Sequence, residues 1–117
     1  MFISPDHLQV LIYTSPIDMR KAIDGLSMLV SEQLGESPTS GSLYVFYNRA
    51  ADKLKILYWD QNGFCLFYKR LEKDRFKLPP SDSQKMTISM QQLRWLLDGL
   101  DIAKIKGHDP LNYQVFL

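Results

Sequence analysis

Cationic and aromatic side chains alternate along the stretch between Asn48 and Lys77. Lysine and arginine can neutralise backbone phosphates and release the counterions condensed on nucleic acid, while aromatic rings supply stacking area. In this stretch cations outnumber carboxylates, whereas carboxylates outnumber cations in the rest of the chain, although the net charge of the whole chain is only +1. The uneven charge predicts a basic surface on a nearly neutral protein.

A β-hairpin is predicted to hold these side chains. The segments Leu54 to Trp59 and Phe64 to Leu71 are joined by Asp-Gln-Asn-Gly, and Asn-Gly is a strong hairpin signal. With an even-numbered turn, strand alternation places Lys55 and Arg70 on one face and Lys69 on the other. Arg70 then lies opposite Lys55 if the turn is a two-residue Asn-Gly loop, or opposite Lys53 if the loop has four residues, and like charges across a ladder are mildly unfavourable.

Two interpretations of this hairpin stay open on spacing alone. In one, it is a phosphate-contacting surface; in the other, the cations merely solvate an exposed sheet face and the aromatics fill the core beneath it. The functional interpretation assigns the contacts to one set of residues: Arg49, Lys53, Lys55, Trp59, Tyr68, Lys69 and Arg70.

The residue types that catalysis would need are missing or scattered. His7 and His108 stand near opposite ends of the chain without ligand spacing, so the sequence predicts no metal site. There is no Gly-rich phosphate loop and no Ser, His, Asp grouping, and Asp18 and Asp24 fit capping and solvated positions. We therefore expect no enzyme activity and no cofactor.

Cellular location is predicted from the lone Cys65 and the N-terminal sequence. A single cysteine allows no internal disulfide, and its apolar neighbours favour a buried thiol in a reducing compartment. The first residues lack a signal-peptide pattern, and no apolar run approaches the roughly 20 residues that cross a bilayer. The expectation is a cytoplasmic protein without a membrane contact.

The remaining patterns predict the elements around the hairpin. Leu8 to Tyr13 and Leu43 to Tyr47 read as strands, and an amphipathic helix of about four turns is expected from Ser15, as N-cap before Pro16, to a stop at Gly35. Ser89 and Gln92 make a capping box for a second helix. Further segments are a short edge strand at 75–78, a polar linker at 81–85, and a poorly defined tail at 101–117 in which YQVFL has a strand-like pattern.

These elements predict one domain over residues 1–117 with an α+β fold. We expect an antiparallel sheet of about four to five strands, with the two amphipathic helices packed on one face. That arrangement would leave the other face available for a ligand or partner.

Three segments in order resemble one known family: DMRKAIDGL from Asp18, the stretch Leu43 to Pro79, and MTISMQQLRWLLDGLD from Met86. They are similar to the TnpB accessory proteins encoded beside the transposase in bacterial insertion sequences of the sixty-six type. The likeness covers roughly residues 10–101. It departs at three positions, where Ala22 and Asp74 replace a usual Gly and Leu78 replaces a usual Trp.

The resemblance implies an accessory role in DNA transposition beside a separate transposase. It supplies context and no catalytic mechanism. The leading hypothesis is a non-catalytic factor that binds nucleic acid, with the ends of the insertion sequence as DNA partner. The alternative is a protein-interaction module that docks on the transposase without touching DNA. DNA, RNA or protein as the direct partner, and the oligomeric state, stay open at this point.

Overall fold

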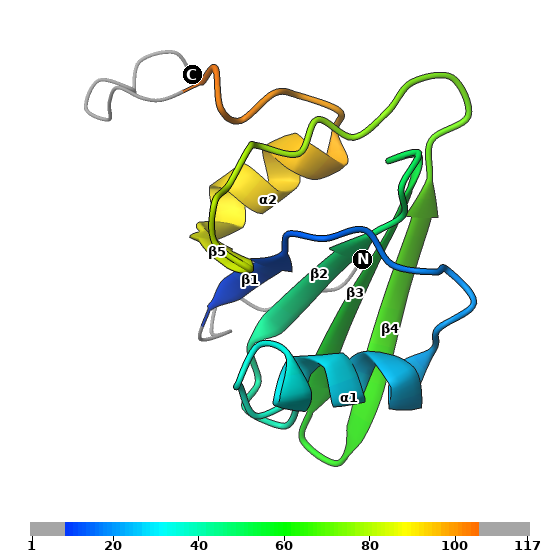
Figure 1. The fold of residues 1–117 in the computed structure, drawn as a ribbon, viewed down its shortest axis with the longest axis vertical. Helices are drawn as coiled ribbons and strands as arrows, with labels where there is room; N and C mark the ends of the chain where they lie inside the picture. The colour runs from blue at the N-terminus through cyan, green and yellow to red at the C-terminus, as the bar shows by residue number, and fades with distance from the viewer. Residues whose placement is uncertain (1–8, 106–117) are drawn as a thin grey trace.

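The computed structural model describes residues 9–105, which form a five-stranded sheet and two helices (Figure 1). The strands lie in the order β4-β3-β2-β1-β5. Strands β1 and β2 pair in parallel and the other neighbours pair antiparallel, so the α+β class is confirmed, with a mixed sheet. The elements are β1 (Val10–Tyr13), α1 (Ile23–Glu32), β2 (Leu43–Tyr47), β3 (Lys53–Asp60), β4 (Gly63–Arg70), β5 (Lys85–Ile88) and α2 (Met90–Leu97).

The two helices pack on opposite faces of the sheet, so the expectation of one shared face is wrong. Leu26 of α1 is buried together with Tyr44 and Leu57, whereas Leu93 of α2 is buried together with Val45. The reason lies in β2, whose sequence LYVFY is apolar at every position. A strand of this kind has apolar side chains on both faces, and both must be covered. Figure 1 shows α1 across β3 and β4 near their connecting turn, and α2 beside β1 and β5.

Helix α1 begins later than the sequence predicts. Ser15 and Pro16 are not its first residues, because the chain stays irregular as far as Ala22, the N-cap. The Asp18 carboxylate accepts a hydrogen bond from the backbone N–H of Arg20 at 2.9 Å, a local turn that competes with helix formation. The start of this segment also docks on the sheet, where Ile17 N–H donates to the Tyr47 carbonyl at 2.8 Å.

The fifth strand lies elsewhere than expected. Residues 75–78 form no strand; Phe76 is instead buried at 3% exposure and its N–H donates to the Ala51 carbonyl at 2.7 Å. Residues 85–88 pair with β1 and form the second edge of the sheet. The first of them, Lys85, was predicted to belong to the polar linker at 81–85. The capping box of α2 is confirmed, with Gln92 N–H donating to the Ser89 hydroxyl at 3.0 Å.

Several predicted features fall outside residues 9–105. They are His7, His108 and the YQVFL segment. Within the described part of the chain, no helix is long and apolar enough to cross a membrane.

Candidate nucleic-acid interface

The turn between β3 and β4 fixes which cations face one another. Asp60 pairs with Gly63, and Gln61 adopts a φ of 56°, so the turn residues are Gln61 and Asn62. Lys53 consequently lies directly opposite Arg70, the pairing expected for the four-residue alternative. Alternation in this register defines an α1 face of the hairpin, which holds Lys53, Lys55, Leu57, Trp59, Phe64, Leu66, Tyr68 and Arg70.

The structure divides the predicted contact residues instead of gathering them on one surface. Lys53, Lys55, Tyr68 and Arg70 are cross-strand neighbours at the end of the α1 face that is remote from the turn. Trp59 lies about 13 Å further along β3 than Lys55 and about 20 Å further than Lys53, given the usual rise per strand residue. There its ring packs edge-on against Phe64 at a centroid distance of 5.0 Å. Trp59 thus packs on Phe64, a residue that contacts the buried cluster beneath α1, and is separate from the cationic end.

Lys55 already has partners inside the protein. Its Nζ donates to the carbonyl oxygens of Met19 and Lys21, each at 2.8 Å, and lies 5.6 Å from the centre of the Tyr68 ring. Hydrogen bonds from an ammonium group to backbone carbonyls are stronger than neutral ones. Through these bonds, Lys55 holds the irregular segment before α1, which includes Met19 and Lys21, against the hairpin.

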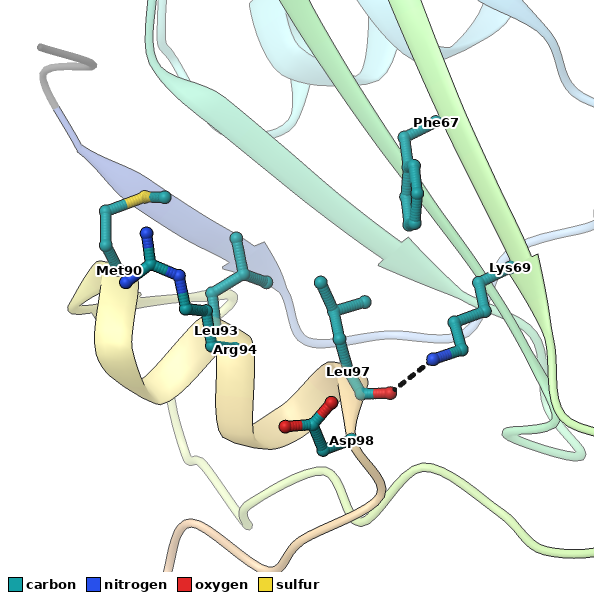
Figure 2. Close-up of a pocket in the computed structure, with 7 residues that line it drawn as sticks. All are labelled: Phe67, Lys69, Met90, Leu93, Arg94, Leu97 and Asp98. Carbon is teal, nitrogen blue, oxygen red and sulfur yellow. Dashed lines mark hydrogen bonds between the residues drawn. The ribbon is translucent and has the colours of Figure 1, made fainter. Parts of the chain in front are cut away.

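Lys69 lies on the opposite face, where its Nζ donates to the carbonyl of Leu97 at 2.8 Å (Figure 2). That carbonyl belongs to the last turn of α2, where a cation also complements the helix dipole. Lys69 lines a hollow of about 350 Å³ between β4 and α2, together with Phe67, Met90 and Arg94. The hollow is on the other side of the sheet from Lys53 and Arg70, so Lys69 does not join their cluster.

Arg49 projects from a tightly bonded loop between β2 and β3. Asn48 bridges this loop: its amide nitrogen donates to the Asp52 carboxylate at 2.8 Å, and its amide oxygen accepts from Lys53 N–H at 3.0 Å. The hydrogen bond from Asn48 is also the main reason that the pKa of Asp52 lies below its usual value. Ala51 completes the turn with a φ of 58°. The Arg49 side chain is exposed and makes no ion pair within residues 9–105.

Carboxylates accompany most of the other cations at this end. Arg70 pairs with Glu72 at 2.9 Å, and Lys53 lies 3.5 Å from Asp52. The exposed Arg70–Glu72 pair contributes little to stability, and the half-buried Lys53–Asp52 contact is long. A multivalent anion can therefore compete for the cations at small cost.

Sequence reasoning missed Arg20 and Lys21 as neighbours of the hairpin, because it placed them on a helix. The structure holds them in the segment that Lys55 fastens beside Tyr68. Arg20 pairs with Asp18 at 2.6 Å, and its hydrogen bonds lower the pKa of Asp18 to about 2. The one available signal was the Asp-Met-Arg-Lys sequence itself, in which an Asp two residues before an Arg favours a turn.

Residues 9–105 contain no group of three or more His, Cys, Asp or Glu side chains placed to hold a metal ion. What the arrangement offers is a concentration of cations around an exposed ring, which can bind an anion.

Comparison with known proteins identifies the family to which the chain belongs. The family model described as IS66 Orf2-like protein matches residues 8–107. The uncharacterized protein y4hO of Sinorhizobium fredii (strain NBRC 101917 / NGR234) is 39% identical over 101 residues, 86% of this chain and 88% of that protein. The uncharacterized protein y4jC of the same strain is 33% identical over 99 residues, 85% of each chain. No solved structure matches at a significant level. The chain belongs to the IS66 Orf2-like family, the TnpB-type accessory proteins of insertion sequences.

Proposed function

We propose that the protein is a non-catalytic accessory factor that binds the DNA of its insertion sequence during transposition. The observation that carries this proposal is the direct pairing of Lys53 with Arg70 across the β3–β4 ladder. Like charges in that position repel each other, and a bound polyanion offsets this repulsion because it attracts both side chains. Arg49 and Tyr68 lie at the same end, so the hairpin cluster consists of Arg49, Lys53, Tyr68 and Arg70.

The other predicted contact residues take supporting roles in this proposal. Lys55 and Lys69 donate to backbone carbonyls of the segment before α1 and of α2, so they position elements around the hairpin. Trp59 packs against Phe64. Nucleic acid would meet the hairpin cluster and leave these three side chains in place.

A salt-titrated binding assay on duplex DNA from the element's ends tests the proposal. The double variant Arg49→Gln, Arg70→Gln should weaken binding, and the slope of log K against log salt should fall by about 1 for each phosphate that the protein no longer neutralises. Lys104→Gln is a matched control, since this exposed lysine lies outside the hairpin cluster. Absence of binding to any nucleic acid even at low salt would refute the proposal.

A second candidate function is a docking module for the element's transposase. It is favoured by the outer edge of β4, which has no neighbouring strand in the described sheet. An open edge can accept a strand from a partner through main-chain hydrogen bonds. Co-purification with the transposase in nuclease-treated extract, unaffected by the Arg49→Gln, Arg70→Gln variant, would support this function over DNA binding.

A further inference from the structure

The aromatic ring of Tyr68 is exposed to solvent beside the cations of the hairpin cluster. Its exposed fraction is 49%, whereas the other aromatic residues of the α1 face are partly buried: Phe64 packs against the cluster beneath α1, and Trp59 packs against Phe64. The ring lies on β4, at the sheet edge, between Leu66 and Arg70 on the same face. Within residues 9–105, the Lys55 ammonium is the one group recorded over this ring, at 5.6 Å from its centre.

Two separate parts of the chain carry cations near this end of the hairpin. Along the strands, Arg70 follows Tyr68 on the same face and Lys53 lies opposite Arg70. From the other direction comes the segment before α1, because the Lys55 ammonium that lies 5.6 Å from the ring centre also bonds the carbonyls of Met19 and Lys21. This segment carries Arg20, whose side chain is 91% exposed, and the exposed Lys21, whose aliphatic stem lies beside Gly25 of α1.

An exposed ring between two sets of cations fits one class of ligand better than others. In a duplex, the faces of the bases are stacked on one another and a ring on a sheet surface cannot reach them. In a single strand, a base can lie on the ring while the phosphates on either side meet cations, and this contact is tolerant of sequence. A protein partner would need no second set of cations around the ring.

We propose that Tyr68 is a stacking site for a base of single-stranded DNA, with Arg70 and Lys53 binding phosphate on one side and Arg20 and Lys21 on the other. The proposal rests on the proposed nucleic-acid-binding function and names the form of DNA that the same surface takes. Asp18 and Glu72 now pair with Arg20 and Arg70 and would yield to the phosphates. Lys55 positions the segment and need not touch DNA itself.

The test compares three ligands of one sequence: labelled single-stranded DNA of about 12 nucleotides, its duplex, and the corresponding RNA strand. Fluorescence anisotropy gives the affinities of the full chain and of two variants. Tyr68→Phe keeps the ring, and Tyr68→Leu keeps apolar bulk without it. Met28→Leu is a matched control, because Met28 is an exposed apolar residue on α1. Circular dichroism establishes that each variant is folded.

We expect the single strand to bind more tightly than the duplex. Tyr68→Phe should bind within about twofold of the parent, whereas Tyr68→Leu should bind about 5- to 150-fold more weakly, the range that stacking of one base corresponds to. Met28→Leu should change nothing.

The outcomes separate this inference from the function on which it rests. Equal binding by Tyr68→Leu and the parent, or preference for the duplex, would overturn the stacking site and leave DNA binding intact. Tighter binding of the RNA strand would overturn the assignment to DNA. If none of the three ligands bound at low salt, the proposed nucleic-acid-binding function itself would be refuted.

Discussion

Replacing Lys55 by Met removes an ammonium group that fastens the segment before α1, while it keeps the apolar stem of the side chain. In the parent, Nζ donates to two carbonyl oxygens at 2.8 Å, those of Met19 and Lys21. A hydrogen bond to a charged group contributes about 1.5–3 kcal/mol. Both bonds share one ammonium on a half-buried side chain, and water can reach the freed carbonyls. We therefore expect a combined loss of about 1.5–3 kcal/mol in the free energy of unfolding.

Urea denaturation followed by circular dichroism measures this loss. The midpoint should fall while the m-value stays constant, because the surface exposed on unfolding is unchanged. Lys73→Met is the matched control: Lys73 is exposed and bonds no other described side chain, so its replacement should shift the unfolding free energy by less than about 0.5 kcal/mol. If Lys55→Met were no more destabilising than Lys73→Met, the role of Lys55 as a fastening residue would be wrong.

Three further perturbations follow from the same structure. Lys69→Met should destabilise by about 1–2 kcal/mol in urea, because the Leu97 carbonyl loses its donor. Leu57→Ala should cost about 3–5 kcal/mol in the same assay, since Leu57 is fully buried between sheet and α1. Asp18 has a folded-state pKa of about 2, below the ordinary value of 3.8, so its contribution to stability is complete above pH 3.8 and disappears as pH falls through 2. Asp18→Asn should flatten that part of the stability profile, and a carboxyl titration by NMR showing a normal Asp18 pKa would contradict this.

Local patterns were sufficient for much of the sheet. The Asn-Gly signal predicted the hairpin, although the turn residues are Gln61 and Asn62, and strand alternation correctly placed Lys53 and Lys55 on one face and Lys69 on the other. The capping box at Ser89 gave the start of α2. These features depend on residues that are neighbours in sequence or directly cross-strand, which is the range over which a single sequence is informative.

The roles of the individual cations could not be predicted in this way. Lys55 and Lys69 have the same residue type and the same strand setting as Lys53, yet their partners are carbonyls contributed by distant segments. The helix start at Ser15 failed for a related reason, because a docked Ile17 and a turn at Asp18 replaced the first helical residues. Only tertiary structure decides which lysine is occupied and which is available.

The position of β1 in the sheet has a consequence for folding of the chain during its synthesis. Strands β2, β3 and β4 are neighbours in both sequence and sheet, so this part can form early. Strand β1, with four buried apolar residues, has β2 on one side and on the other β5, whose Ile88 pairs with Val10. During synthesis one apolar edge of β1 therefore stays open until residues 85–88 leave the ribosome. A chain truncated before Lys85 should keep that edge exposed and aggregate through it, which gives the short strand β5 the role of a protective edge.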